Sequence, residues 1–282
     1  MTGDNLHLPL LLLLSMALTF FLMPRFIALL QQGESGFTAN NYEGKRIITA
    51  GGVVILPAVI IPLIIYTDTI TYRLLLIIFL AGMVALGLVD DLLGEKTCKG
   101  FRGHFGLLWR GKKVSTGLLK AVGGFSLALL AAAGVGGIYS IEWLVRGGVL
   151  ALFANLFNLL DTRPAMAVKA FYLISLAYIF FGVGELLIIF LLWVSLYVYL
   201  PWELSRKVML GDTGAYLLGG TLGFITIFSF SSGKLYIFLI FLLLVHVLLE
   251  RYSLSNLLER GAQRCELLRF YGSAIIKWRS KQ

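Results

Sequence analysis

Four short polar motifs interrupt an otherwise apolar chain, and their residue types suit the binding of phosphate and metal. The motifs are Ile48-Thr49-Ala50-Gly51-Gly52, Asp90-Asp91, Asn155-x-x-Asn158-x-x-Asp161 and Gly211-Asp212-x-Gly214. Carboxylates are costly next to hydrocarbon, so they are kept there mainly when they have a task. Acidic side chains that converge at one membrane face would form a site for Mg²⁺ and a phosphate group.

Asp90 and Asp91 end the third apolar segment of the chain. Successive residues of a helix lie about 100° apart, so both carboxylates cannot face lipid cheaply. One interpretation is a Mg²⁺ ligand beside a general base, because Mg²⁺ takes a few carboxylates together with substrate phosphates. The alternative is a solvated helix end, which tolerates acidic residues.

Two further polar motifs also fall at ends of apolar segments. Asn155, Asn158 and Asp161 recur every three residues, which predicts one broad helix face that binds a metal or a sugar. The alternative is hydrogen bonding between helices, which is common for Asn in membranes. Asp212 opens the eighth segment, where it is either an ordinary helix cap or a metal ligand beside phosphate-binding N–H groups. Gly219 and Gly223 predict close helix packing.

The composition predicts an all-α polytopic membrane protein. The chain has 282 residues, of which 59% are hydrophobic and 14% charged, whereas a soluble domain is about 25% charged. A spanning helix needs roughly 20 mostly apolar residues. Nine segments fit: 8–30, 47–67, 72–90, 116–134, 141–160, 165–182, 184–200, 214–230 and 235–250. We expect one transmembrane domain over 1–282, with a basic tail at 251–282.

The basic residues predict the orientation of the chain, because Lys and Arg are enriched in cytoplasmic loops. With the N-terminus outside and the C-terminus cytoplasmic, only Arg73, Arg146 and Lys234 of the 24 Lys and Arg residues lie outside. The enrichment of Lys and Arg in cytoplasmic loops, and their contact with anionic lipid head groups, explain most of the net charge of +9. We therefore expect no nucleic-acid partner. Cys98 and Cys265 are then expected to be free cytoplasmic thiols.

The basic loop over 91–115 offers further candidate residues. Glycine lets the backbone approach an anion, and lysine supplies charge, so Lys112 in this loop and Lys120 shortly after it are candidate substrate-binding residues. The alternative is anchoring on the cytoplasmic face. The spacing Gly106-x-x-x-x-Gly111-Lys112 imitates a P-loop. A P-loop is nevertheless excluded, because Lys113 replaces the required Ser or Thr and no strand precedes this segment. His104 and His246 are isolated, as structural histidines usually are.

From about residue 45 to 220, the order and spacing of the motifs resemble the polyprenyl-phosphate N-acetylhexosamine-1-phosphate transferase superfamily, glycosyltransferase family 4. It includes the bacterial phospho-N-acetylmuramoyl-pentapeptide transferases and the enzymes that load N-acetylglucosamine phosphate onto undecaprenyl or dolichyl phosphate. The resemblance implies Mg²⁺-dependent transfer of a sugar phosphate from a UDP-amino sugar to polyprenyl phosphate, with release of UMP. It also implies the cytoplasmic face of a bacterial inner membrane and the synthesis of a cell-wall or surface-polysaccharide intermediate.

The resemblance assigns roles to the motif residues, which are matched in order along the chain. Asp90 and Asp91 match the aspartate pair, one of which is proposed as the base; Asp91 and Asp212 are the implied metal ligands; Asn155, Asn158 and Asp161 match the nucleotide-sugar motif; Lys45 and Thr49 match the loop near the pyrophosphate. Three features differ from the family pattern. Asp161 is followed by Thr-Arg-Pro-Ala instead of Gly-x-Asp-Gly, the late histidine cluster is missing, and nine spans replace the usual ten.

Two other functions are compatible with these motifs. The chain could be a non-catalytic relative that binds polyprenyl phosphate, or a secondary transporter with a carboxylate ion site. Transporters place charges near the middle of the membrane and show inverted repeats, whereas the acids here lie at the ends of segments. Homodimer formation is left open by the sequence.

Overall fold

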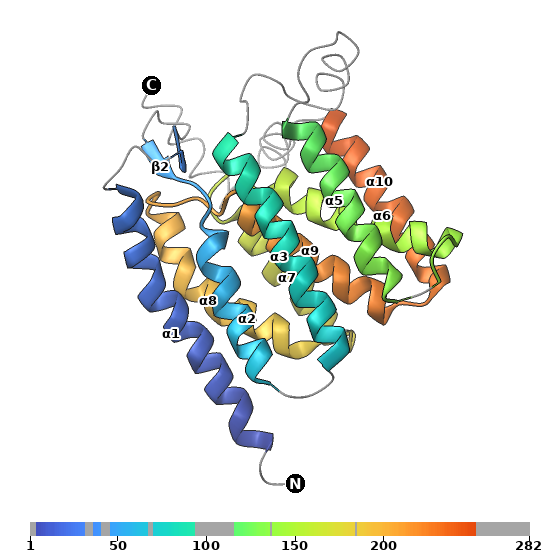
Figure 1. Ribbon diagram of the computed structural model, residues 1–282, viewed down its shortest axis with the longest axis horizontal. Helices are drawn as coiled ribbons and strands as arrows, with labels where there is room; N and C mark the ends of the chain where they lie inside the picture. The colour runs from blue at the N-terminus through green and yellow to red at the C-terminus, as the bar shows by residue number, and fades with distance from the viewer. Residues whose placement is uncertain are drawn as a thin grey trace, which may run out of the picture.

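The computed structural model describes residues 4–31, 36–40, 46–66, 70–93, 116–135, 137–183 and 185–251. These residues form an all-α bundle with one small sheet (Figure 1). The helices are α1 (Asp4–Gln31), α2 (Gly52–Ile65), α3 (Ile70–Leu93), α5 (Thr116–Ala133), α6 (Ile141–Leu160), α7 (Met166–Phe180), α8 (Leu186–Leu204), α9 (Gly211–Ser229) and α10 (Ser232–Arg251). The basic tail predicted at 251–282 lies outside the described residues, apart from Arg251.

Five of these helices are long and apolar enough to cross a membrane. They are His7–Gln31, Tyr72–Leu92, Ile141–Leu160, Leu186–Leu204 and Ser232–Leu249. Shorter apolar helices cover Gly52–Ile65, Lys120–Ala133 and Met166–Phe180. A helix satisfies its own backbone hydrogen bonds, which is why long apolar segments take this form in hydrocarbon. The prediction of an all-α membrane helix bundle is confirmed at this level.

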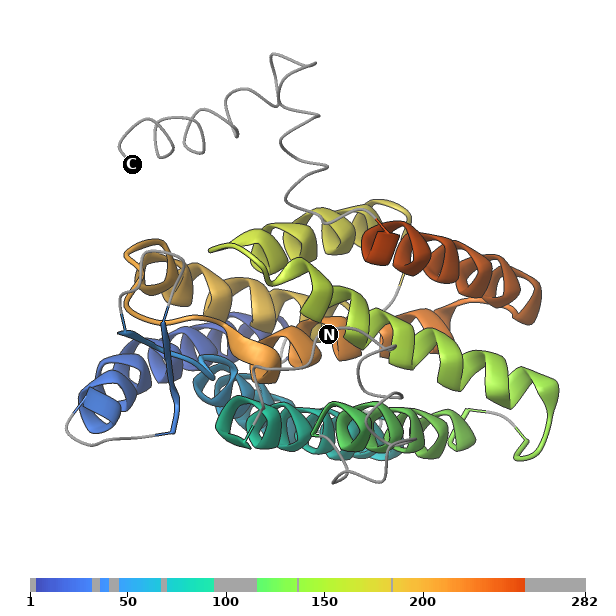
Figure 2. The same cartoon turned by 90° about the horizontal axis from the view of Figure 1, so that it is seen from above.

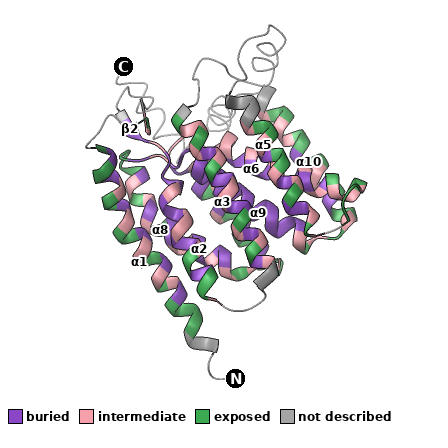
Figure 3. Cartoon of the chain, viewed as in Figure 1, coloured by how far each residue is buried: buried purple, intermediate pink, exposed green. Residues whose placement is uncertain are grey.

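Helix α9 forms the centre of the bundle. Nearly all of its residues from Gly211 to Ile227 are buried, whereas α1 and α10 carry many exposed apolar side chains (Figure 3). Helices α2, α3, α6 and α7 all pack against α9. In Figure 2, α1 and α8 lie on one side of the molecule, and α6 and α10 on the other. Because its neighbours are protein and not lipid, α9 accommodates glycine and threonine without a strongly apolar surface.

Glycines allow the close approach of α9 to its neighbours. A Cβ atom at Gly219 would lie 2.4 Å from the backbone oxygen of Phe153 in α6, and one at Gly223 would lie 3.0 Å from the Phe153 side chain. The packing predicted for Gly219 and Gly223 is therefore confirmed. The approach between α2 and α9 is closer still, since a Cβ atom at Gly52 would lie 2.2 Å from the backbone nitrogen of Gly214.

The helix of the second apolar segment begins later than predicted. The expected span over 47–67 was wrong at its start, because Arg46–Ile48 forms strand β2, which pairs antiparallel with β1 (Thr38–Asn40). Ala50 then adopts a left-handed conformation with φ of 66°, which a helix cannot accommodate, and α2 starts at Gly52. Ile48 also bridges to Val208 in parallel, so this segment lies against the turn that precedes α9.

Candidate active site

Four helix ends meet at one end of the bundle, which is called the site end below. It consists of the last turns of α3 and α6 and the first turns of α5 and α9, and it lies towards the top of Figure 1. Gly87 of α3 makes this meeting tight, because a Cβ there would lie 2.6 Å from the backbone nitrogen of Thr213. Asp91 lies one helical turn after Gly87, so the same contact brings the Asp90-Asp91 pair to the start of α9.

Lys120 lies between two of the predicted site acids. Its Nζ donates to Asp90 Oδ2 at 3.1 Å and forms an ion pair with Asp212 Oδ2. The Lys120, Asp90 and Asp212 side chains are only 15%, 22% and 20% exposed. Charge-assisted hydrogen bonds in a poorly solvated position are stronger than those at the surface. Three residues from α3, α5 and α9 are thus held together by charge.

Asn158 joins this group from the end of α6. With its amide oriented to satisfy both neighbours, Nδ2 donates to Asp212 Oδ1 at 2.7 Å and Oδ1 accepts from Lys120 Nζ at 2.8 Å. The aromatic ring of Tyr216 lies on another side of the ammonium group, with its centroid 5.0 Å from Nζ. Of the acids expected to converge, Asp90 and Asp212 therefore share one contact network here, together with Asn158 and Lys120.

Asp91 points to the start of α9 and not to Lys120. Its two carboxylate oxygens accept the backbone N–H groups of Asp212 and Thr213, each at 3.2 Å. Helix α9 has no cap from its own N-cap residue, Leu210. Asp91 therefore caps α9 from a neighbouring helix, where the partial positive charge of the helix start stabilises an anion. This leaves the side chain of Asp212 available to Lys120 and Asn158.

Asp161 and Glu203 lie beside the same helix start. The two carboxyl groups are close enough for the charge of Glu203 to act on Asp161. Burial, and then the neighbouring charge of Glu203, raise the pKa of Asp161 well above its ordinary value. Asp161 thus lies within the electrostatic influence of three other acids of the site end, Glu203, Asp212 and Asp91.

The turns that lead into this end contain strained backbone. Ala50, Ala165 and Arg206 have φ of 66°, 62° and 59°, in the left-handed region that glycine favours. Ala50 and Ala165 lie just before α2 and α7, and Arg206 lies just after the end of α8. Such residues persist only when their surroundings fix them, and they tend to occur at functional sites. The local strain is therefore consistent with a preorganised site.

The remaining predicted residues lie outside this contact network. Thr49 donates its N–H to the Phe37 oxygen at 2.8 Å, and its Oγ1 is buried without a hydrogen-bond partner among the described residues. Asn155 is half-buried one turn before Asn158, and within the described ranges it has no hydrogen bond to the cluster. Lys45 and Lys112 lie outside the described residues. Their predicted roles stay predictions.

Sequence reasoning missed two residues of this region. Glu203 lies in the last turn of α8 and is 2% exposed, and Tyr216 lies one turn after Asp212 and is 4% exposed. Glu203 had a usable signal, because an acid at the end of a long apolar segment is itself a candidate for function. Tyr216 had none, since an aromatic residue within an apolar helix is usually core.

The donor atoms of the cluster suit a hard cation. Oxygens of Asp90, Asp212 and Asn158 surround one point, which the Lys120 ammonium occupies. Carboxylate and amide oxygens are the ligands that Mg²⁺ prefers. Within the described ranges no three His, Cys, Asp or Glu residues are grouped as a ready metal cage. The donor chemistry therefore fits a Mg²⁺ ion that keeps water or substrate oxygens among its ligands.

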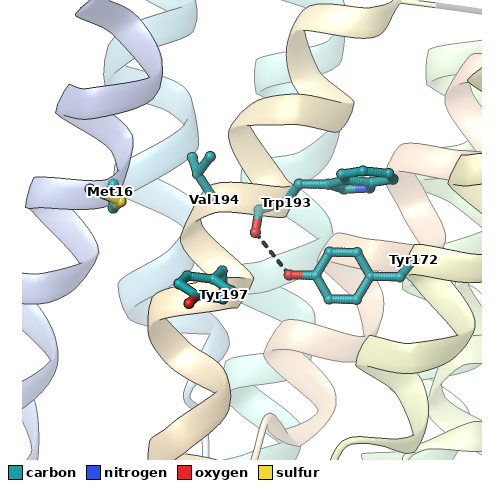
Figure 4. A pocket seen from close by; sticks show the side chains of 5 residues that line it. All are labelled: Met16, Tyr172, Trp193, Val194 and Tyr197. Carbon is teal, nitrogen blue, oxygen red and sulfur yellow. Dashed lines mark hydrogen bonds between the residues drawn. The ribbon is translucent and has the colours of Figure 1, made fainter. Parts of the chain in front are cut away.

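A separate pocket lies midway along α8, between α1 and α7. It has a volume of about 280 Å³ and is lined by Met16, Tyr172, Trp193, Val194 and Tyr197 (Figure 4). The Tyr172 hydroxyl donates to the Trp193 backbone oxygen at 2.8 Å, which leaves the lining almost wholly apolar. Without a charged residue in its lining, this pocket cannot take part in phosphate chemistry.

No protein-family model matches this chain, and no curated protein does. Any assignment of function therefore depends on the motifs and on the geometry of the site end.

Proposed function

We propose that this protein transfers an amino-sugar-1-phosphate from a UDP-sugar to a polyprenyl phosphate and releases UMP. The observation that supports this proposal most directly is the cluster in which Asp90, Asp212 and Asn158 surround Lys120 at one end of a membrane helix bundle. Phosphoryl transfer requires mainly positioning and charge neutralisation, which such a group supplies. The order of the four polar motifs also supports this reaction, through their resemblance to the superfamily.

The proposed reaction is a displacement at the β-phosphorus of the UDP-sugar. An oxygen of the lipid phosphate forms the new bond to this phosphorus, and the bond to the bridging oxygen of the α-phosphate breaks. UMP leaves with that electron pair. A phosphate monoester has a second pKa near 6 and is largely dianionic at pH 7. The nucleophile thus needs orientation more than it needs a strong base.

The side chains of the cluster have distinct parts in this proposal. Asp90, Asp212 and the Asn158 oxygen would hold Mg²⁺, which when bound neutralises charge on the diphosphate. The Lys120 ammonium, which these oxygens bind in the structure, would give way to the cation and stabilise negative charge on the adjacent phosphate oxygens. Asn158 orients both Lys120 and Asp212 through its amide. Asp91 fixes the start of α9 through two backbone N–H groups.

The membrane arrangement belongs to the same proposal. We infer nine spans with the N-terminus outside, which places the site end at the cytoplasmic face of a bacterial inner membrane. UDP-sugars are cytoplasmic, and only Arg73, Arg146 and Lys234 of the 24 basic residues then lie outside. Helix α2, with 14 residues, would span less than the usual hydrocarbon thickness of about 30 Å. Its N-terminal strand and turn would lie at the cytoplasmic boundary.

The deciding experiment supplies the purified protein with Mg²⁺, undecaprenyl phosphate and a panel of UDP-amino sugars, and measures UMP. We expect release that depends on both the lipid phosphate and Mg²⁺, and a Glu185→Gln variant, altered at the other end of α8, should match the wild type. If undecaprenyl phosphate binds but no UDP-sugar yields UMP, the protein is a non-catalytic binder. Uptake of a solute into proteoliposomes without UMP release would instead indicate a transporter.

A further inference from the structure

The oxygens that suit a hard cation at the site end already bind an ammonium group. Lys120 Nζ lies 3.1 Å from Asp90 Oδ2 and 2.8 Å from Asn158 Oδ1, and it forms an ion pair with Asp212 Oδ2. Mg²⁺ requires oxygen contacts of about 2.0–2.1 Å, which these oxygens cannot make while the ammonium group lies among them. Lys120 and a divalent cation therefore compete for one set of ligands.

The competition is strong because the ammonium group is attached to the chain and poorly exposed. The side chains of Lys120, Asp90 and Asp212 are 15%, 22% and 20% exposed, so like charges among them repel more than they would in water. A tethered group also acts at a high effective concentration. A divalent cation alone must therefore break the contacts of Lys120 before it can bind.

The other groups described around Lys120 do not replace these contacts. Asp91 already accepts the backbone N–H groups of Asp212 and Thr213, each at 3.2 Å. The Tyr216 ring, whose centroid is 5.0 Å from Nζ, attracts a cation only through its π face. Movement towards solvent would exchange charge-assisted hydrogen bonds for contacts with water. The acids thus hold Lys120 until a further anion arrives.

A diphosphate is an anion that can receive the ammonium group. Phosphate oxygens are strong acceptors, and lysine binds them as a compact charge on a flexible stem. Diphosphate oxygens also suit Mg²⁺, which takes few carboxylates and keeps substrate oxygens among its ligands. Transfer of Lys120 from the acids to the phosphate would free the acids when the metal and the diphosphate are both present.

We propose that Lys120 regulates the loading of the site: it blocks the acids against a divalent cation alone and releases them when a diphosphate binds. The metal and the diphosphate then bind cooperatively, and each raises the affinity of the site for the other by the same factor. This regulation rests on the proposed function, because the diphosphate is that of the UDP-sugar. Its measurement requires no turnover.

The first test measures binding of Mn²⁺, a spectroscopic substitute for Mg²⁺, to the purified protein in detergent without nucleotide. Lys120→Met keeps most of the apolar stem and removes the charge. We expect this variant to bind Mn²⁺ about 10- to 150-fold more tightly than the wild type, as for the removal of one competing charge-assisted hydrogen bond. Electron paramagnetic resonance of free Mn²⁺ gives the affinity. Equal affinities would overturn the inference.

Lys207→Met is the matched control, because it removes the same charge from the exposed turn between α8 and α9. Lys207 Nζ lies over the Trp202 ring, 5.3 Å from the centroid, and solvent screens its charge. Its loss should change Mn²⁺ affinity by less than about fivefold. A gain equal to that of Lys120→Met would show a general effect of net charge and would overturn the inference.

A second neutral variant covers the case in which Lys120→Met does not fold. Lys120→Gln keeps hydrogen-bond donors for the acids but carries no charge, so it should also bind Mn²⁺ more tightly than the wild type. Unchanged affinity in a folded Lys120→Gln protein would count against the inference in the same way.

The second test uses UDP, a diphosphate without a sugar to transfer. In the wild type, UDP should raise Mn²⁺ affinity by about 5- to 150-fold, after allowance for the Mn²⁺ that UDP binds in solution. That allowance is the same for both proteins, and the coupling should be clearly smaller in Lys120→Met, whose acids are already accessible. Absence of coupling in the wild type, or undiminished coupling in Lys120→Met, would overturn the regulatory role of Lys120.

These outcomes separate the inference from the proposed function. If no UDP-sugar yields UMP, but Lys120→Met gains Mn²⁺ affinity and loses coupling to UDP, the proposed reaction fails and the regulation of the site stands. If UMP is released but neither change occurs, the reaction stands and the inference fails.

Discussion

At the residue scale, Asp212 and Asp91 have different tasks although both are acids at one helix start. The side chain of Asp212 contacts Lys120 and Asn158, whereas Asp91 accepts the backbone N–H groups of Asp212 and Thr213. The sequence left open whether Asp212 is a helix cap or a functional acid. The structure assigns the cap to Asp91, which makes the functional alternative for Asp212 the stronger one.

Replacement of Asp212 by Asn should separate catalysis from folding. Asp212→Asn keeps the size of the side chain but removes a charge beside Lys120, so UMP release should fall by at least about 100-fold. Stability should fall by about 1.5–3 kcal/mol, as for a lost hydrogen bond to a charged group, because α9 keeps its cap and Asp90 still pairs with Lys120. UMP release and thermal unfolding in detergent measure the two effects. Near-normal UMP release by a folded Asp212→Asn protein would remove Asp212 from the proposed mechanism.

Asp91→Asn is the matched comparison, because it alters the cap and leaves the Lys120 cluster in place. An amide has one carbonyl oxygen where the carboxylate has two, so one of the two backbone N–H groups loses its acceptor. We expect a stability loss of about 0.5–2 kcal/mol, as for other cap substitutions. A loss of UMP release without any loss of stability would favour the metal role that the resemblance implies for Asp91.

The raised pKa of Asp161 predicts that the stability of the protein depends on pH. Burial and the nearby Glu203 raise the pKa of Asp161. A carboxyl group with a raised folded-state pKa contributes stability below its ordinary pKa near 4, and that stability is lost as the pH rises through the raised value. Asp161→Asn, which cannot ionise, should therefore gain stability relative to the wild type as the pH rises above about 4. Unfolding temperatures in detergent test this, and a constant difference between the two proteins would contradict it.

At the scale of the elements, glycine contacts decide how closely α3 and α9 approach. The Cβ of an alanine at position 87 would lie 2.6–2.7 Å from backbone atoms of Asp212 and Thr213. Backbone cannot move aside as a flexible side chain can, so the two helices would have to separate. The Asp90-Asp91 pair would then move away from Asp212.

Gly87→Ala should therefore damage both folding and activity. Overpacking of this kind costs about 1–3 kcal/mol, and the shifted acids should lower UMP release by at least about tenfold. Gly124→Ala in α5 is the control, because its Cβ meets only the Met83 Cε atom, at 3.9 Å. That control should be neutral or slightly stabilising, since alanine favours a helix interior over glycine. Equal behaviour of the two variants would show that the α3–α9 contact is not limiting.

At the scale of the whole molecule, the orientation in the membrane determines which substrates can reach the site end. Ser205 lies in the exposed turn between α8 and α9, and Ser231 lies in the exposed turn between α9 and α10. Helix α9 connects these two turns, so they lie at opposite ends of it. The positive-inside rule predicts that Ser205 is cytoplasmic and Ser231 is external.

Single-cysteine labelling checks this orientation. Cys98 and Cys265 are first replaced by Ser, and then Ser205→Cys or Ser231→Cys is introduced. An impermeant thiol reagent should label Ser231→Cys in intact cells, and Ser205→Cys only after the cells are opened. Labelling of Ser205→Cys from outside would place the site end away from cytoplasmic UDP-sugars and would contradict the proposed function.

The sequence by itself determined the helical class and most of the helix positions. Its apolar segments are long enough to dictate helices in hydrocarbon, where no other local structure satisfies the backbone. It also selected Asp90, Asn158, Asp212 and Lys120, because polar residues in apolar surroundings are few and therefore visible. The close packing at Gly219 and Gly223 could also be predicted from the sequence, since small residues recur there at a helical spacing.

Only the tertiary structure decided how these residues divide their tasks. Asp91 caps α9 because the close contact at Gly87 brings the end of α3 to the start of a helix more than a hundred residues further along the chain. The side chain of Asp212 pairs instead with Lys120. The start of α2 also depended on tertiary contacts, since Ile48 pairs with Val208 instead of continuing a helix. Local periodicity carries no information on such pairings, because they depend on which helix ends meet in space.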